Sequence, residues 1–230
     1  MSLPVAILSG GLATRLRPIT EKIPKALVPV AGKPFLARQL DLLHDQGIRE
    51  VVVCVGYRGE MVRAAIPDGK PWNMQLSYVF DGPQLLGTGG ALRQALPYLG
   101  DAFFVLYGDS YLPTDYQAVA THFASTGKTG LMTVYPNEGQ WDTSNVVFCS
   151  GQIVVYDKRH RVPDMRYIDY GLGILTPRAF AGLEQETPLD LAVVYQKMIA
   201  TGQLAGYEVR ERFYEIGSPT GLAELEILLA

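Results

Sequence analysis

Glycines and cations gather in one segment near the start of the chain, GGLATRLRPITEKIPKALVPV, residues 10–30. The glycine pair Gly10 and Gly11 directly follows the apolar run PVAILS. Glycine lets the backbone turn sharply and brings unshielded N–H groups close to an anion. Arg15 and Lys25 follow in the same segment. Because arginine forks onto two phosphate oxygens and lysine supplies a mobile point charge, the segment is a candidate phosphate cradle.

The glycines alone leave two interpretations open. A glycine pair after a strand can be a simple tight turn, with the basic side chains solvated. The segment is not the dinucleotide fingerprint GxGxxG, because Ala13 interrupts it, and the P-loop pattern GxxxxGK[ST] occurs nowhere in the chain. The order of the later motifs therefore has to decide between a turn and a phosphate site.

Two further polar groups follow apolar runs that are typical of strands. Asp109 comes after FFVLYG, and the pair Asp157 and Lys158 comes after QIVVY. An aspartate at a strand end is most often a turn former, and an exposed Asp-Lys pair is usually an ion pair of little energetic value. A carboxylate is also the oxygen ligand that Mg²⁺ takes. The spacing alone does not decide whether these residues are structural or bind a ligand.

The other titratable residues show no catalytic arrangement. The histidines, His44, His122 and His160, fall outside these motifs, and no Ser/His/Asp or Cys/His arrangement indicates covalent catalysis. Cys54 and Cys149 lie in apolar, strand-like runs and are too few for a disulfide framework or a zinc site. We therefore expect two buried free thiols in a reducing compartment.

The elements that must position these groups alternate in the first half of the chain. Near-continuous apolar strands separated by helices are what a parallel sheet covered on both faces requires. The first half is therefore predicted to be a doubly wound α/β layer. The expected strands are residues 4–9, 50–55, 75–80 and 103–107, and the expected helices are residues 34–46, 59–66 and 88–99.

The pattern changes after residue 128, where strands follow one another. No flexible linker divides the halves, so we predict one domain, 1–230, with two lobes of about 1–127 and about 128–230. The last helix has a leucine-rich face that we expect to pack on the sheet. The expected later strands are residues 130–136, 144–151, 152–159 and 170–176, and the expected helices are residues 188–201 and 219–229.

Composition excludes several classes of partner. The 230 residues are 48% hydrophobic, which is ample for a buried core. A net charge of −3 provides no broad positive field for nucleic acid or a membrane surface. No run approaches the roughly 20 apolar residues of a membrane span, and the start lacks a signal-peptide pattern. We expect a cytoplasmic protein with neither nucleic-acid nor membrane partners.

The order of the motifs resembles that of a known family. GGLATRLRP followed by IPKALVPVAGKP is similar to the pattern GGxGTRLxP, spacer, PKPxxPxxGKP of the sugar-1-phosphate nucleotidyltransferases. The chain departs at Ala13, where glycine is usual, and at Ala26, where proline is frequent. The resemblance implies a Rossmann-like, mostly parallel α/β sheet with a strand-rich sugar-binding lobe, the GT-A-like nucleotidyltransferase fold. The first lobe would bind the nucleotide and the second the sugar phosphate.

The resemblance also implies a nucleotide site. In the family, the loop backbone and the residues matching Arg15 and Lys25 hold the nucleotide phosphates. DGPQLLGTGGALRQAL resembles the family segment ExPLGTGGAL, whose loop contacts the base, although Thr88 could equally cap the helix that begins there. The implied nucleotide-binding residues are Leu8, Gly10, Gly11, Leu12, Ala13, Thr14, Arg15, Lys25, Gly87, Thr88 and Gly89.

Metal and sugar residues follow from the same resemblance. VLYGDSYL is similar to the strand-terminal GD of the family, so Asp109 is the expected Mg²⁺ ligand. FYEIGSPTGLAEL is similar to the DxGTPxxY ending, with Glu215 as a second ligand in place of aspartate. Lys158 matches the lysine that binds the sugar phosphate, and Asp157 replaces a sugar-binding glutamate. Asn145, Asp169 and Gly171 fall at further sugar-contact positions, with His160 nearby. The implied catalytic residues are Arg15, Lys25, Asp109 and Lys158.

The implied reaction joins a nucleoside triphosphate to a sugar 1-phosphate and releases pyrophosphate. LGTGGAL and the short length are most similar to guanylyltransferases that act on manno-heptose 1-phosphate or mannose 1-phosphate. Uridylyl- or cytidylyltransferases, including the muramate 1-phosphate type, are the alternative. A non-catalytic nucleotide-sugar-binding homologue is a different class, but such proteins tend to lose the residues that match here. A metal-dependent glycosyltransferase would more naturally show a DxD run, which is absent. The sequence does not decide whether the protein forms a homodimer.

Overall fold

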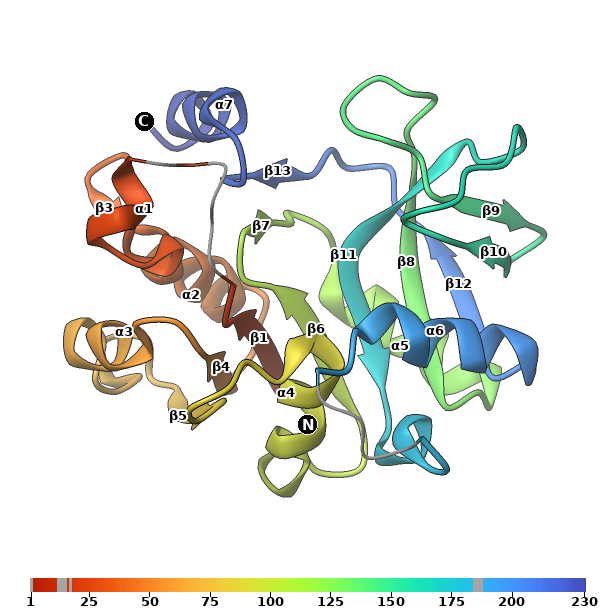
Figure 1. Cartoon of the computed structure of the whole chain (residues 1–230), viewed down its shortest axis with the longest axis horizontal. Helices are drawn as coiled ribbons and strands as arrows, with labels where there is room; N and C mark the ends of the chain where they lie inside the picture. The colour runs from red at the N-terminus through yellow and green to blue at the C-terminus, as the bar shows by residue number, and fades with distance from the viewer. Residues whose placement is uncertain (1, 12–15, 17, 184–187) are drawn as a thin grey trace.

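The protein is built on one nine-stranded sheet, seen in the computed structural model in Figure 1. The structure describes residues 2–11, 16, 18–183 and 188–230. From one edge to the other, the sheet contains β5 (Gln75–Phe80), β4 (Glu50–Val55), β1 (Val5–Ser9), β6 (Phe103–Tyr107), β11 (Tyr167–Leu175), β8 (Gly130–Pro136), β12 (Leu204–Glu208), β10 (Gln152–Tyr156) and β9 (Val146–Cys149).

The first four strands of this order form the predicted parallel layer. β1 pairs in parallel with β4 on one side and with β6 on the other. Its side chains alternate, so that Val5 and Ile7 join one apolar core and Ala6 joins a second core on the opposite face. Helices α2 (Phe35–Asp45) and α3 (Gly59–Ala65) cover the first face, and α4 (Gly87–Ala95) covers the second. The doubly wound layer is confirmed.

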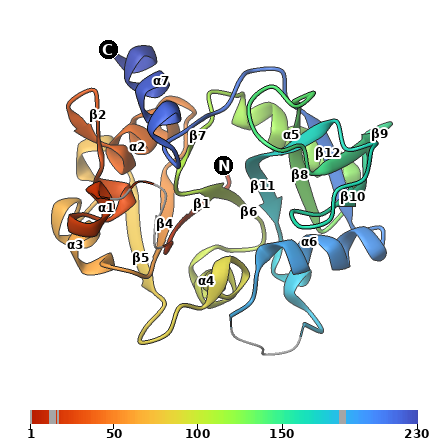
Figure 2. The ribbon, with the colours of Figure 1, turned by 45° about the horizontal axis from the view of Figure 1, so that its top comes forward.

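The second half of the sheet is mixed in direction. β11 runs antiparallel to both β6 and β8, whereas β12 runs parallel to β8. β9 and β10 form a hairpin through Ser150 and Gly151, whose φ angles of 50° and 78° suit a tight two-residue turn. Helices α5 (Tyr116–Thr126) and α6 (Leu191–Ala200) lie on opposite faces, and Figure 2 shows α4 and α6 together on one side.

Several predicted boundaries differ from the structure for local reasons. α6 begins at Leu191 because Asp190 caps it by accepting a hydrogen bond from the Ala192 amide. The helix expected over 88–99 begins at Gly87 and ends in a 3-10 turn, Leu96–Tyr98, which contains a proline. Neither β12 nor α5 was among the expected elements, and Gly206 weakens the alternation of β12.

The last helix, α7 (Pro219–Leu229), corrects a second expectation. It packs on a small third core that includes Val28, Phe35 and Leu225, and not on the large sheet. Ile227 is 79% exposed, so the predicted apolar face is only partly buried. Figure 1 shows α7 above α2 and β3, away from β8 and β12. The ribbon pairing described next directs the chain to this place.

Two short ribbons and several single turns connect these layers. β7 (Ser110–Tyr111) pairs with β13 (Tyr214–Glu215), and β2 (Pro29–Val30) pairs with β3 (Lys33–Pro34). The first ribbon brings the end of the chain back to the residue that follows Asp109. The remaining short elements are α1 (Ile19–Lys22) and the 3-10 turns η2 (Lys25–Leu27), η3 (Lys70–Trp72) and η5 (Pro177–Phe180).

The two cysteines differ in environment, which corrects the expectation that both are buried. Cys54 is buried within β4, whereas Cys149 is exposed because it ends an edge strand beside the hairpin turn. Burial, followed by the charge of Asp81, raises the pKa of the Cys54 thiol to about 12.

Among the described helices, none has the length and apolar character that crossing a bilayer demands.

We predict that the folded protein exposes one reactive thiol. A chromogenic disulfide reagent at pH 8 should modify one thiol per chain, since thiolate is the reactive form and Cys54 stays protonated and covered. In strong denaturant the same reagent should modify two. Absorbance of the released thiolate measures both, and Cys149→Ser is the control that should leave the folded protein unreactive. Rapid modification of Cys54 in folded C149S would contradict the burial of β4.

Candidate active site

A cavity of about 280 Å³ opens where the parallel strands β1 and β6 end. The carboxyl ends of parallel strands are the usual place for a ligand site in such sheets. The cavity collects residues from four separate segments of the sequence. The predicted site residues that line it are Leu8, Gly10, Gly11, Lys25, Gly87, Thr88 and Asp109. The predicted residues Leu12, Ala13, Thr14 and Arg15 lie outside the described residues, and their roles stay predictions.

A close approach between two strand ends sets the shape of the cavity. The Gly108 amide donates to the Leu8 carbonyl at 3.0 Å. A Cβ on Gly108 would lie 2.3 Å from that carbonyl oxygen and 2.5 Å from Ser9 Oγ, so no larger residue fits without separating the strands. The glycine therefore allows Asp109 to stand beside the Gly10-Gly11 loop.

Side chains and backbone groups from distant segments clamp the Gly108-Asp109 turn. The buried Gln39 of α2 donates through Nε2 to the carbonyls of Tyr107 and Ser110, at 3.1 and 2.9 Å. The Ile216 amide donates to the Asp109 carbonyl at 2.9 Å. These bonds hold the backbone on both sides of Asp109. They therefore fix the position of the Cα from which its side chain extends.

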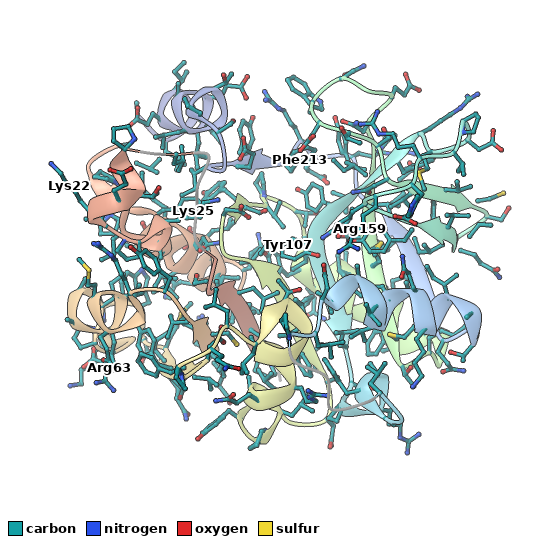
Figure 3. The ribbon with its side chains drawn as sticks, in the orientation of Figure 1. Lys22, Lys25, Arg63, Tyr107, Arg159 and Phe213 are labelled. Carbon is teal, nitrogen blue, oxygen red and sulfur yellow. The ribbon has the colours of Figure 1, made fainter. Side chains whose placement is uncertain are left out.

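An ion pair joins the predicted phosphate-binding lysine to the predicted metal-binding aspartate. Lys25 Nζ lies 3.0 Å from Asp109 Oδ2, with the side chains 17% and 33% exposed. Lys25 begins the turn η2 directly after Pro24, whose extended backbone directs the chain toward the sheet edge. Figure 3 labels Lys25 in the left part of the molecule and Tyr107 near its centre. The pair therefore combines a cation and an oxygen donor at one wall of the cavity.

The two predicted metal ligands are placed differently. Asp109 presents a half-buried carboxylate to the cavity, with one oxygen held by Lys25. Such a hard oxygen donor fits Mg²⁺, which uses one or two carboxylates and takes waters or phosphate oxygens for the rest. The carboxylate of Glu215 instead accepts hydrogen bonds from the Gly217 amide and the Ser218 hydroxyl at the start of α7. The structure thus brings only Asp109 into the cavity, and metal ligation by Glu215 stays a prediction.

The start of α4 forms another wall of the cavity, through Gly87 and Thr88. Thr88 does not cap its own helix; its hydroxyl accepts the Leu191 amide at 2.8 Å and lies 3.2 Å from Asp190 Oδ1, so it caps α6. The Gly89 amide donates to the Leu189 carbonyl at 2.9 Å, which places Gly89 beneath the cavity and not on its surface. Segment 188–191 therefore supports the loop from below.

The cavity contains one acidic residue that the sequence analysis did not single out. Asp81 follows β5 directly and lines the wall beside Leu85. Its Oδ2 accepts a hydrogen bond from the Leu86 amide at 3.3 Å. Desolvation by burial raises the pKa of this carboxyl from its ordinary value, and the Leu86 bond opposes that shift. Its place at a strand end, as the first residue of DGPQLLGTGG, was the available signal.

The predicted sugar-site residues gather around a second, neighbouring cluster. Asp169 Oδ2 accepts hydrogen bonds from the hydroxyls of Tyr107 and Tyr156, at 3.1 and 3.0 Å. Lys158 Nζ lies 3.4 Å from the Tyr107 hydroxyl. Asn145 Oδ1 accepts the Asp169 amide at 2.9 Å. Tyr107 also lines the nucleotide-side cavity, so the two groups of predicted residues meet at this tyrosine.

The remaining predicted residues lie around that cluster with different environments. Gly171 has φ of 97°, a conformation that favours glycine, and donates its amide to Asp169 Oδ1 at 3.1 Å. Asp157 accepts the amides of Arg159 and His160 at 2.7 and 2.9 Å, so its carboxylate caps a turn of its own segment. These bonds, that of His160 first, lower the pKa of Asp157. His160 is largely exposed and lies beside Asp157.

Comparison with known proteins agrees with this geometry. Residues 5–144 match the family described as "Nucleotidyl transferase". HddC of Yersinia pseudotuberculosis, solved with GMP-PN, superposes with a TM-score of 0.83 over 99% of this chain and 100% of that one, at 23% identity. That likeness confirms the fold class expected from the sequence.

Relatives of known name act on different sugar phosphates. The heptose 1-phosphate guanylyltransferase of Campylobacter jejuni is 37% identical over 47% of this chain and 48% of its own length. The N-acetylmuramate 1-phosphate uridylyltransferase of Neisseria meningitidis is 28% identical and covers 96% of both chains. Nucleotidyltransferase Agl11 of Haloferax volcanii is 29% identical over 97% of this chain. This chain spans only 65% of that relative's length and 61% of a mannose-1-phosphate guanylyltransferase from Xenopus tropicalis.

We predict that the wall formed by Gly87 tolerates no side chain. Gly87 has φ of 76°, and a Cβ there would lie 2.5 Å from the Leu189 carbonyl oxygen. Gly100 has φ of 66° with open space around its Cβ position, so it is a matched control. Urea unfolding should show Gly100→Ala losing about 1 kcal/mol from backbone strain alone and Gly87→Ala losing about 2–4 kcal/mol, because the loop must also move. Equal losses would contradict the close approach.

Proposed function

The chain belongs to the nucleotidyl transferase family, and from that premise we propose that it condenses a nucleoside triphosphate with a sugar 1-phosphate to release pyrophosphate. The first choice of substrates is GTP with manno-heptose 1-phosphate or mannose 1-phosphate. One observation carries the proposal. The cavity that contains the Gly10-Gly11 loop, Lys25 and Asp109 meets the Lys158 cluster at Tyr107. Two anion-binding groups thus stand side by side.

The chemistry needs charge neutralisation more than a general base. A phosphate monoester has its second pKa near 6, so at neutral pH an oxygen of the sugar phosphate is already a nucleophile. In-line attack on the α-phosphorus forms the new P–O bond and breaks the bond to pyrophosphate, which leaves with its electron pair. The main obstacles are repulsion between two polyanions and their alignment, which positioned cations overcome.

The proposed roles follow from where each cation stands. The amides of Gly10 and Gly11 and the ammonium of Lys25 bind the triphosphate at the β1 end of the cavity. Arg15, which lies outside the described residues, keeps its predicted role as a further phosphate-binding cation. Lys158 binds the phosphate of the sugar 1-phosphate on the far side of Tyr107. Asn145, Asp157, Asp169 and Gly171 surround the sugar. These groups orient both substrates, and Gly87 and Thr88 at the start of α4 border the base.

Asp109 would hold Mg²⁺ in this arrangement. The ion, when bound, neutralises charge on the triphosphate and on the departing pyrophosphate. The half-buried carboxylate oxygens of Asp109 suit it, whereas Glu215 would have to leave the start of α7 to become a second ligand. Lys25 provides a counter-charge to Asp109 from the chain itself, 3.0 Å away.

Asp81 supports guanine as the base. Guanine presents its N1–H and its N2 amino group as adjacent donors, and a carboxylate accepts both. Uracil presents a single N–H between two carbonyls, which a carboxylate repels. Asp81 lines the cavity beside the loop that would enclose the base, and burial strengthens any hydrogen bond made there. The uridylyltransferase alternative rests on the relative of equal length, which acts on N-acetylmuramate 1-phosphate.

The proposal includes a cytoplasmic location, where nucleoside triphosphates are available and the free thiols of Cys54 and Cys149 stay reduced. Neither nucleic acid nor a membrane is part of it, because the net charge is −3. A homodimer stays open.

The experiment that tests the function measures pyrophosphate. Purified protein with Mg²⁺, each nucleoside triphosphate in turn and a panel of sugar 1-phosphates should release pyrophosphate fastest with GTP and a manno-configured sugar. Asp109→Asn should lower kcat at least about 100-fold, because it removes a charge that faces the reacting phosphates. Asp101→Asn, on the exposed surface, is the control. Binding of nucleotide sugar without pyrophosphate release from any pair would favour the non-catalytic class.

A second prediction concerns the base. Replacing Asp81 by asparagine should lower the ratio of kcat/KM for GTP over UTP by about tenfold, because an amide offers one acceptor and one donor in place of two acceptors. Paired kinetics with the two nucleotides and one sugar phosphate measure the ratio, again with Asp101→Asn as the control. A folded variant with an unchanged ratio would remove Asp81 from base recognition.

A further inference from the structure

We infer that Tyr107 is a positioning residue: with Tyr156 it forms an aromatic seat that fixes the Lys158 ammonium at the boundary of the nucleotide cavity. The identity of the anion that Lys158 then binds rests on the proposed function, whereas the seat itself does not. Tyr107 lies in VLYGDSYL and Tyr156 ends QIVVY, but the sequence analysis assigned a role to neither tyrosine.

Tyr107 occupies the one place that touches both groups of site residues. It ends β6, two residues before Asp109, and the amide of the buried Gln39 holds its carbonyl at 3.1 Å. The residue lines the nucleotide cavity, and its hydroxyl reaches Asp169 of β11, 62 residues away in sequence. Tyr107 therefore lies at the boundary between the nucleotide cavity and the Lys158 cluster.

The seat has two aromatic faces. Lys158 Nζ lies 5.0 Å from the centre of the Tyr107 ring and 5.7 Å from that of the Tyr156 ring. Both distances are within the roughly 6 Å over which a ring face attracts a cation. The Tyr107 hydroxyl oxygen, 3.4 Å away, can accept from the ammonium. A lysine side chain is flexible by itself, so these contacts decide where its charge stands.

Asp169 positions both tyrosines of the seat, and its hydrogen bonds to them leave Lys158 without an ion pair to this carboxylate. Its Oδ2 accepts from both tyrosine hydroxyls, and its Oδ1 accepts the Gly171 amide. Asn145 holds the Asp169 backbone. Burial, and then the negative charge of Asp169, raise the pKa of Tyr107 and Tyr156, so both hydroxyls stay protonated and donate. The tyrosines are therefore locked as neutral groups.

The charge of Lys158 remains available for a ligand. Asp157, its neighbour, uses its carboxylate on the Arg159 and His160 amides. Within the described part of the chain, no carboxylate forms an ion pair with Lys158. A positive charge held by ring faces, not by a carboxylate, is not neutralised before an anion arrives. Under the proposed function that anion is the sugar phosphate, placed against the nucleotide cavity.

The kinetic test separates the hydroxyl from the ring. Tyr107→Phe keeps the ring and loses the bonds to Asp169 and Lys158, and Tyr107→Leu loses the ring as well. KM for the sugar 1-phosphate should rise about fivefold in Y107F and at least about tenfold in Y107L, while KM for the nucleotide changes less than about twofold. Tyr98→Phe, at an exposed tyrosine, is the matched control. Equal changes in both KM values, or none in Y107L, would overturn the inference.

A spectroscopic test needs no turnover. Reductive ¹³C-methylation keeps each lysine charged and gives it an NMR signal, and Lys158→Arg assigns the signal of Lys158. Ring currents should shift the Lys158 methyl signals upfield of those of Lys70, whose side chain is 88% exposed. Y107L should move them toward the Lys70 position, and Y98F should not.

The two tests fail in different ways. Lys158 signals that coincide with those of Lys70, or that ignore Y107L, overturn the seat whatever the enzyme does. Upfield Lys158 signals that depend on Tyr107, in a protein that releases no pyrophosphate from any substrate pair, support the seat and remove the proposed function. If Y107L does not fold, the same comparison with Y107F decides, since loss of the hydroxyl should loosen the ring and reduce the shift.

Discussion

The parallel pairing of β1 with both β4 and β6 is the constraint on which the site depends. The pairing brings the carboxyl ends of three strands together. Because residue 108 is glycine, the backbone after β6 can contact the backbone at the end of β1. That close approach positions the polar groups of both strand ends in the cavity. The Gly10-Gly11 loop and the carboxylate of Asp109 face one space because no side chain separates the strands that carry them.

The protein assembles positive charge locally against a net charge of −3. Lys25 is held 3.0 Å from Asp109, and Lys158 is held by aromatic rings. Under the proposed function, in which two polyanions must meet, this difference matters. A lysine paired with a carboxylate is positioned but partly neutralised, whereas a lysine seated on tyrosines is positioned and keeps its full charge. Tyr107 lies between the two and belongs to both environments.

The parallel layer and the ends of its strands were readable from the sequence, but the directions of side chains were not. Apolar runs predicted the parallel layer, and a glycine-aspartate pair after one of them predicted Asp109 at the sheet edge. Thr88 caps a helix that begins 103 residues later, a partner that the sequence does not reveal. Glu215 accepts a hydrogen bond from Ser218, three residues further on, at the start of α7. Tyr107 and Asp81 were missed because a tyrosine after FFVL and an aspartate after a strand look like ordinary core and turn residues until neighbouring strands are placed.

The central claim is that this strand-end cavity holds a triphosphate with a divalent ion on Asp109. Crystals grown with a non-hydrolysable GTP analogue and Mn²⁺, measured at a wavelength where manganese scatters anomalously, test it directly. The account predicts an anomalous peak within coordination distance of the Asp109 carboxylate, with the phosphates against Gly10, Gly11 and Lys25. A nucleotide bound elsewhere, or a manganese peak remote from Asp109 beside a bound triphosphate, would contradict it.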